Sequence, residues 1–176
     1  MFQQQKAWYA IYVSPRQEEK VKQRLEAELG DDFELVVPKR KLRERKGGQW
    51  RFVTRKLFPG YILFNGMLDI DTYYSIKRIP EVIRLLKDES TILTINEEEL
   101  RVLNVLLGKT ENTVEISTVL KEKDKVQVIE GPLMGLEGRI VSINARKGRA
   151  KVKLNLGSQE KVVELGITVV EKEQAE

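Results

Sequence analysis

The sequence of 176 residues contains neither cysteine nor histidine. The lack of cysteine excludes a disulfide framework, and the two absences together exclude the usual zinc sites and the Ser-His and Cys-His pairs of nucleophilic enzymes. No stretch approaches the roughly 18 apolar residues that a membrane span requires. The N-terminal residues, MFQQQKAWYAIYV, lack the apolar core of a signal peptide, so we expect a cytoplasmic protein that does not contact a membrane.

The composition that remains is that of a folded protein with an uneven charge distribution. Hydrophobic residues make up 41% and charged residues 33% of the chain, as in globular domains. The net charge is only +4, whereas residues 39–56 hold nine basic residues and one acid, a local charge of +8. This concentration indicates an anionic partner for that segment.

The first half of the chain alternates strand and helix patterns. WYAIYV at residues 8–13 predicts a strand, and Ser14 followed by Gln17 fits a capping box that predicts a helix starting there. Gly30 stands where that helix should end. The apolar residues at intervals of four, expected on its buried face, are Val21, Leu25 and Leu29.

Further elements are predicted from Phe33 to Gly108. Gly47-Gly48 predicts the tight turn of a β-hairpin, Pro80 should end a helix over residues 71–79, and Asn96 should cap a helix that ends at Gly108. That last helix should bury Leu100, Leu103 and Leu107. The additional strands expected are FELVVP, GYILF and VIRLL.

The second half changes in character after a polar segment. Residues 109–118 predict a linker, and residues 119–176 contain five short β-rich runs with glycines at the breaks. We expect a constitutive small β-barrel there, because each interior glycine would cost a helical form about 1 kcal/mol. The predicted fold class is α+β, with domains at 1–108 and 119–176. The six glycines are Gly131, Gly135, Gly138, Gly148, Gly157 and Gly166.

Two motifs resemble the NusG family of transcription elongation factors. LFPGYILF at residues 57–64 resembles a strand of the family's N-terminal (NGN) domain, and VQVIEGPLMGLEGRIV at residues 126–141 resembles the KOW motif of its C-terminal barrel. The resemblance covers essentially the full chain. It implies an antiparallel sheet with three helices, followed by a small all-β, SH3-like barrel.

The resemblance also implies that the N-terminal domain docks on the clamp of RNA polymerase while the barrel recruits another partner. By position, the docking residues would be Trp8, Phe58, Tyr61 and Phe64. Surface aromatics are common anchors of protein interfaces, although the alternative that these residues belong to the core stays open. We expect no enzymatic activity, no cofactor and no metal. We also expect a monomer, because nothing in the sequence requires a second copy.

The basic segment should lie near nucleic acid. One candidate partner is the non-template DNA strand. Basic side chains attract phosphate without reading sequence, and an aromatic side chain at the turn can stack on an unpaired base. The alternative is a solvated edge that prevents aggregation. The candidate residues are Lys39, Arg40, Arg43, Arg45, Lys46, Trp50 and Arg51.

A second basic run in the barrel, RIVSINARKGRAKVK, carries six basic residues and no acid. In this the chain is similar to the specialised LoaP-type antiterminators of the family, which implies that the barrel binds a hairpin in nascent RNA. Duplex RNA is recognised mostly through shape and backbone contacts. The alternative is a half-buried strand with a solvated face. The candidate RNA-binding residues are Arg139, Arg146, Lys147, Arg149, Lys151 and Lys153.

Three other functions compete with this hypothesis. A general elongation and pausing factor would use the barrel to recruit a ribosomal or termination protein. A ribosome-associated protein would use the KOW barrel for rRNA. A magnesium-dependent nuclease could use Asp69 with Asp71, but these aspartates stand where helix caps belong.

Overall fold

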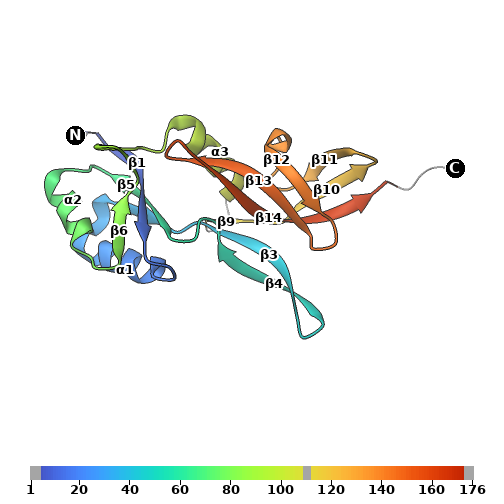
Figure 1. Ribbon diagram of the computed structural model, residues 1–176, viewed down its shortest axis with the longest axis horizontal. Coiled ribbons are helices and arrows are strands. Elements are labelled where there is room, and N and C mark those ends of the chain that lie inside the picture. The colour runs from blue at the N-terminus through green and yellow to red at the C-terminus, as the bar shows by residue number, and fades with distance from the viewer. Residues whose placement is uncertain (1–4, 109–111, 173–176) are drawn as a thin grey trace. The chain divides into compact units, whose positions relative to one another are not determined.

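The computed structural model describes residues 5–108 and 112–172 (Figure 1). It separates into two compact units that are each discontinuous in sequence. Unit 1 comprises residues 1–38, 58–100 and 155–159, and unit 2 comprises residues 39–57, 101–154 and 160–176. The hairpin that carries the first basic segment therefore belongs to unit 2, together with most of the C-terminal sheet.

Unit 1 is built on a four-stranded antiparallel sheet in the order β2-β5-β1-β6. Side chains alternate between the two faces along each strand, and residues that pair across adjacent strands share a face. Tyr9 of β1 pairs with Phe64 of β5 on the core face, and Tyr12 pairs with Tyr61 on the other face. The strand bounds are β1 Ala7–Val13, β2 Glu34–Val36, β5 Tyr61–Gly66 and β6 Val82–Leu85.

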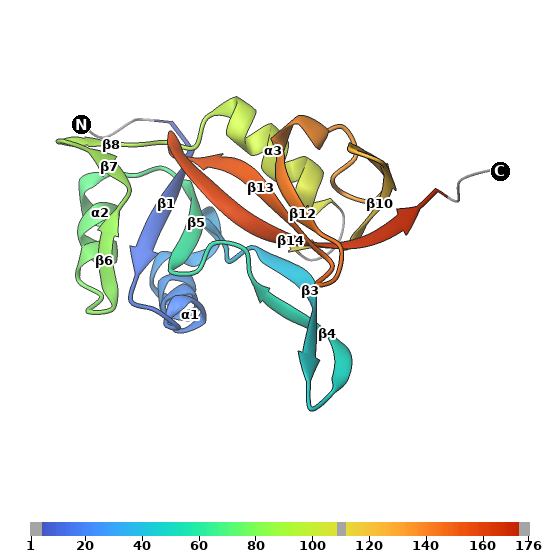
Figure 2. The same ribbon diagram turned by 45° about the vertical axis from the view of Figure 1, so that its right-hand side comes forward.

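Two helices cover the core face of this sheet. Helix α1 (Glu18–Leu29) contributes Val21 and Leu25, and helix α2 (Ile70–Lys77) contributes Ile76, to the same buried cluster as Tyr9 and Phe64. The apolar spacing predicted for α1 is confirmed for Val21 and Leu25, whereas Leu29 is half-buried. Figure 2 shows α1 and α2 beside the sheet formed by β1, β5 and β6.

The predicted capping box of α1 is wrong. The helix begins at Glu18, its N-cap is Gln17, and no side chain caps it. Ser14 instead belongs to a turn, in which its carbonyl accepts a hydrogen bond of 3.1 Å from the Gln17 N–H. The other end agrees with the sequence, because Gly30 is the C-cap and has a φ of +74°.

The basic segment forms the predicted hairpin. Strands β3 (Lys39–Lys46) and β4 (Gln49–Lys56) pair along their full length, and Gly47 and Gly48 have φ values of +59° and +79°. Two successive residues with positive φ produce the tight turn that matches strand twist, which explains the glycine pair. In both views the turn between β3 and β4 points away from the C-terminal sheet (Figures 1 and 2).

The expected linker is partly ordered. Strand β9 (Thr113–Val114) pairs in parallel with the start of β3, and Val114 is buried. Strand β10 already begins at Ser117. The prediction for residues 109–111 lies outside the described residues.

Helix α3 (Glu97–Leu107) has the predicted cap, because the Asn96 side chain accepts a hydrogen bond of 2.9 Å from the Glu99 N–H. Its buried face differs from the prediction. Val102, Leu103 and Leu106 are buried, whereas two of the three predicted leucines are half-buried. The remaining short elements are η1 (Gly30–Asp32), β7 (Lys87–Asp88) and β8 (Thr91–Ile92).

The C-terminal sheet has five strands in the order β11-β10-β14-β13-β12, which confirms the all-β prediction. Strand β10 pairs with β14 in parallel, and β12 pairs with β13 antiparallel. Four of the predicted break glycines have positive φ, whereas Gly166 lies inside β14. The bounds are β10 Ser117–Glu122, β11 Lys125–Glu130, η2 Glu137–Arg139, β12 Ile140–Asn144, β13 Arg149–Leu156 and β14 Gln159–Glu171.

Candidate functional site

The two faces of the β3–β4 hairpin differ in charge. Residues that pair directly across an antiparallel ladder share a face. The acid, Glu44, pairs with Arg51, whereas Arg43 pairs with Phe52 and Arg45 pairs with Trp50 on the opposite face. Of the predicted residues, Arg45, Lys46, Trp50 and Arg51 are exposed, and Lys39, Arg40 and Arg43 are half-buried.

Glu44 is held by a cation of its own hairpin. Its two carboxylate oxygens accept hydrogen bonds of 3.0 and 2.7 Å from Arg55. The Arg55 hydrogen bond, partly opposed by desolvation, lowers the pKa of the Glu44 carboxyl. The carboxylate therefore stays charged and paired, which leaves the other basic residues of the hairpin in excess.

Arginines at the base of the hairpin join it to the C-terminal sheet within unit 2. Arg40 donates a hydrogen bond to the Glu164 carbonyl, and Arg149 donates to the Arg43 carbonyl at 3.0 Å and to the Glu164 carboxylate at 3.1 Å. Burial lowers the pKa of the Arg40 guanidinium, although Glu164 partly opposes this effect. Arg40 and Arg149 are thus engaged within the protein rather than presented to solvent.

The second basic run is more accessible around the turn between β12 and β13. Arg146 and Lys147 are both exposed there, and the Lys147 N–H donates a hydrogen bond of 3.0 Å to the Asn144 side chain, which orders the turn. On β13, Lys151 and Lys153 are exposed, as the alternating pattern predicted, and Lys153 lies 3.7 Å from Glu160. Such an exposed pair contributes little to stability.

Two residues of the predicted RNA-binding set lie apart from this accessible group. Arg149 has a side chain only 17% exposed because of its contacts to the hairpin. Arg139 ends η2 and is half-buried. The structure therefore brings four of the six predicted residues to exposed positions on β13 and its preceding turn.

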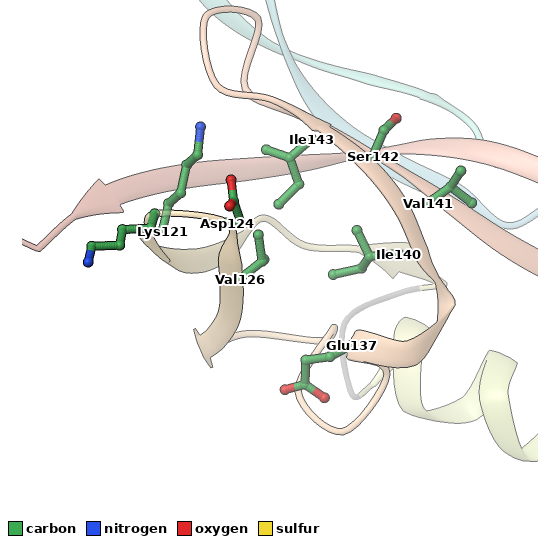
Figure 3. Close-up of a pocket in the computed structure, with 9 residues that line it drawn as sticks. Lys121, Asp124, Val126, Glu137, Ile140, Val141, Ser142 and Ile143 are labelled. Atoms are coloured by element: carbon green, nitrogen blue, oxygen red, sulfur yellow. The ribbon is translucent and has the colours of Figure 1, made fainter.

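A pocket of about 360 Å³ lies in unit 2 beside the two edge strands, β11 and β12. Figure 3 shows the side chains of Val126, Ile140 and Ile143 facing one another across it. Charged side chains surround this apolar centre: Lys121, Lys123, Asp124 and Glu137. The sequence did not predict this site. The alternation of apolar and polar residues in β12 does not reveal that β12 is an edge strand of the sheet.

The predicted polymerase-docking residues divide by burial. Phe58 and Phe64 are 3% and 0% exposed, so both belong to the core. Phe64 packs on Tyr9 and Phe33, with ring centroids 6.0 and 5.3 Å apart. Trp8 and Tyr61 are half-buried and retain accessible surface. Of the four aromatics, only Trp8 and Tyr61 therefore offer surface to a partner in the folded protein.

Tyr12 and Arg84 join Tyr61 on the same face of the sheet. The Tyr12 and Tyr61 rings lie 5.1 Å apart, and the Arg84 guanidinium lies 5.8 Å from the Tyr12 ring centroid. Register explains this grouping, because Tyr12 pairs with Tyr61 in β5 and with Arg84 in β6. The alternation of WYAIYV was a signal for Tyr12, since it places Trp8 and Tyr12 on one side.

Two further features of the described residues bear on other kinds of site. No cluster of three or more acidic side chains suitable for a metal ion occurs in residues 5–108 and 112–172. Within the same ranges, no helix has the length and apolar character needed to cross a bilayer.

Comparison with known proteins identifies the family. The family model described as transcription termination factor NusG matches residues 6–104, and the KOW motif matches residues 122–153. The chain belongs to the NusG family. The transcription termination/antitermination protein NusG of Halalkalibacterium halodurans is 32% identical, and the alignment covers 96% of this chain and 99% of that protein. NusG of Bacillus subtilis is 30% identical, with the same shares covered.

A solved structure of Thermotoga maritima NusG agrees with the fold. It matches with a TM-score of 0.59 at 23% identity and covers 92% of this chain and 94% of that one. The predicted fold class, an NGN domain followed by a KOW domain, is thereby confirmed. All of the named relatives are NusG proteins, that is, transcription factors.

Proposed function

We propose that this NusG-family chain is an antitermination factor that docks on the RNA polymerase clamp and is recruited by a hairpin in nascent RNA. Residues 1–108 form the polymerase-binding domain, residues 109–118 the linker and residues 119–176 the RNA-binding barrel. Two weak contacts joined by a short linker raise the effective concentration of each for the other. Neither contact then has to be tight by itself.

The observation that carries the RNA-binding part is the exposed turn between β12 and β13. Arg146 and Lys147 occupy that turn, and Lys151 and Lys153 continue from it along β13 on the solvated side. A solvated strand face accounts for the two lysines on β13, because alternation alone exposes them. It does not account for two further cations in the turn, which suit phosphate contacts with structured RNA.

RNA binding by the turn is tested with the full chain. Binding of Arg146→Ala/Lys147→Ala to a pool of RNA hairpins and to matched single strands is measured across a salt series. The control is Lys123→Ala/Lys125→Ala, which removes the same charge from another exposed turn of the same sheet. The proposal expects a preference for particular hairpins that survives high salt and is lost only in the first variant. Equal losses in both variants would mean that only net charge matters.

Polymerase binding is tested through Tyr61. Its ring is half-buried beside Tyr12, so Tyr61→Ala removes accessible aromatic surface at the edge of the sheet. Truncating an aromatic anchor at an interface costs about 2 kcal/mol or more. The control is Tyr74→Ala, because Tyr74 is 55% exposed on α2. An unchanged affinity of Tyr61→Ala for RNA polymerase would refute this docking surface.

The pocket beside β11 and β12 favours a second candidate function. Its apolar centre of Val126, Ile140 and Ile143, bordered by charged residues, suits a protein side chain better than a phosphate. A general elongation factor would recruit a ribosomal or termination protein there. Ile143→Ala removes apolar surface from the pocket without adding charge, so it would weaken such recruitment and leave the affinity for RNA hairpins unchanged.

A further inference from the structure

The two edge strands of the C-terminal sheet lie on either side of the pocket in unit 2. Strands β11 and β12 stand at the two ends of the strand order, so each pairs on one side only in the part of the chain that the structure describes. The pocket is nevertheless lined from both strands, by Val126 of β11 and by Ile140 and Ile143 of β12 (Figure 3). The sheet therefore curves until its two edges approach each other without pairing.

Strand β12 lacks the usual protection of an exposed edge. Edge strands are commonly guarded by charged residues or proline, which oppose pairing with another chain. Residues 140–144 read IVSIN and contain neither, although charged residues make up 33% of the whole chain. The free edge of β12 therefore presents its backbone donors and acceptors without a charge on the strand itself.

A bulge limits the length of the segment that β12 accepts. The register with β13 shifts between Ile140 and Ser142, which makes Val141 the extra residue of the strand. The Val141 side chain is 52% exposed and lines the pocket. Bulges interrupt a ladder and twist an edge away from long, flat partners. Residues 142–144 stay regular, so the edge suits a short extended segment rather than the long strand of a second copy.

The charged side chains that line the pocket cancel. Lys121 and Lys123 are balanced by Asp124 and Glu137, a sum of 2 − 2 = 0. The pocket therefore has no net charge with which to attract phosphate, unlike the two basic runs of the chain. An apolar centre inside a polar rim is instead the arrangement found at interfaces between proteins.

These charges are separated along the pocket. Figure 3 shows Lys121 and Asp124 near the C-terminal end of β12, whereas Glu137 lies near its N-terminal end. Lys123 belongs to the same turn as Asp124, so the first end has a net charge of 2 − 1 = +1 and the second has −1. Complementary charges across an interface fix the direction in which a partner binds.

We propose that an extended segment of a partner protein binds between β11 and β12, pairs with residues 142–144 and inserts apolar side chains between Val126, Ile140 and Ile143. The segment runs antiparallel to β12, the more common orientation, so it carries an acid before its apolar residues and a base after them. In such strand addition, backbone hydrogen bonds supply affinity and side-chain pockets supply specificity. The inference rests on the second candidate function, recruitment of a protein at this pocket, and states the chemistry of the recruited segment.

A synthetic peptide tests the site in the full chain. The probe is the capped, fluorescently labelled peptide Asp-Thr-Val-Thr-Ile-Thr-Lys, and fluorescence anisotropy measures its affinity. Ile143→Ala weakens binding by at least about 5-fold, because it removes apolar surface at the centre of the pocket. The control is Val162→Ala, which truncates a residue that is 52% exposed on β14 and does not line the pocket. It leaves the affinity unchanged.

Altered peptides separate strand addition from simple apolar contact. Two further probes carry N-methyl groups at alternate residues, one on each edge of the peptide, so each keeps every side chain and loses the N–H donors of one edge. Only one of them loses affinity, because only one edge faces β12. The charge-reversed peptide Lys-Thr-Val-Thr-Ile-Thr-Asp binds about 3- to 10-fold more weakly, since it places like charges together at both ends of the pocket.

Four results would overturn the inference. They are no binding of the probe at millimolar concentration, equal affinity of wild type and Ile143→Ala, equal affinity for both N-methylated peptides, and equal or tighter binding of the charge-reversed peptide. Self-association of the chain that Ile143→Ala abolishes would also contradict it, because the occupant would then be a second copy. The second candidate function fails separately: a chain that binds the probe as proposed, but binds no ribosomal or termination protein, contradicts that function and still supports strand addition.

Discussion

The buried carboxylate of Glu18, the first residue of α1, accepts a hydrogen bond of 2.7 Å from the backbone N–H of Gly60. Gly60 has a φ of +87°, and its carbonyl accepts a hydrogen bond from the Val13 N–H at 2.8 Å. An acid on the helix therefore fixes the turn that leads into β5 and sets the position of Tyr61. This explains why an acidic residue is only 1% exposed.

Removing this acceptor should destabilise the protein. Glu18→Ala should lower the free energy of unfolding by about 1–3 kcal/mol, because the Gly60 N–H is left buried without this acceptor. Glu18→Gln keeps an acceptor oxygen and should lose less. Urea unfolding measures both, and Glu26→Ala, at an exposed position of α1, should change stability by less than about 0.5 kcal/mol. Equal losses in Glu18→Ala and Glu26→Ala would contradict the role of Glu18.

Phe58→Ala should act on stability rather than on polymerase contact. Phe58 is 3% exposed, and removing a buried phenylalanine costs about 3–5 kcal/mol. Thermal unfolding of Phe58→Ala and Tyr61→Ala separates the two effects, since truncating the half-buried Tyr61 should cost less stability than truncating the buried Phe58. A Phe58→Ala protein of normal stability that fails to bind polymerase would show that Phe58 itself makes the contact.

Gly166→Ala should destabilise unit 2 through a steric clash. A Cβ atom at Gly166 would lie 2.4 Å from the Lys41 carbonyl oxygen and 3.1 Å from Cγ1 of Ile116. Because the nearer atom is backbone, β3 or β14 must shift, at a cost of about 1–3 kcal/mol. Gly138→Ala is the matched control, since a Cβ atom there has no neighbour within 4 Å. Circular dichroism melts should show the loss only in Gly166→Ala.

Arg149→Ala should also destabilise unit 2, unlike the other RNA-binding candidates. Arg149 bonds to the Glu164 carboxylate and to the Arg43 carbonyl, and its loss should cost about 1–3 kcal/mol. Lys151→Ala, on the exposed side of the same strand, should leave stability unchanged. Chemical denaturation of the two variants provides the comparison. If both are as stable as wild type, Arg149 does not hold the base of the hairpin.

Asp69 should make α2 sensitive to acid. Its carboxylate caps the helix by accepting a hydrogen bond of 2.8 Å from the Thr72 N–H, and this bond lowers the pKa of the Asp69 carboxyl below 3.8. A depressed pKa contributes stability that is present above the unfolded-state value and is lost as the pH falls through the folded-state value. Asp69→Asn keeps a capping oxygen without the charge. The stability advantage of wild type over this variant should therefore shrink as the pH falls below about 4. A constant difference would contradict this assignment.

The sequence predicted most elements of the fold because their signals are local. Gly47-Gly48 requires positive φ at both turn positions, and Asn96 caps the helix that follows it, so both features are readable without tertiary information. The capping box predicted at Ser14 is wrong because serine is also common in turns. Here the Ser14 carbonyl accepts the Gln17 N–H and forms a turn before the helix begins.

The sites were harder to predict because they depend on register and on distant segments. Nothing local distinguishes the exposed Arg146 from the engaged Arg149, whose partners lie on β3 and β14. Phe64 and Tyr61 lie on the same strand, yet only Tyr61 retains accessible surface, because α1 and α2 cover the face of the sheet that holds Phe64. The alternation of aromatic rings and cations on one face of the β3–β4 hairpin likewise becomes apparent only once β3 and β4 are aligned.

The parallel pairing of β10 with β14 sets an order of events during synthesis. Ser117 pairs with Ile167 and Lys121 with Glu171, so β10 receives this neighbour only after about 50 further residues have been added. Ribosomes add roughly 5–20 residues per second, which makes the delay about 3 to 10 seconds. The sheet of unit 1 has all of its strands well before that. During the delay Val119, fully buried in the finished protein, lacks the β14 residue Val169 that pairs with it there.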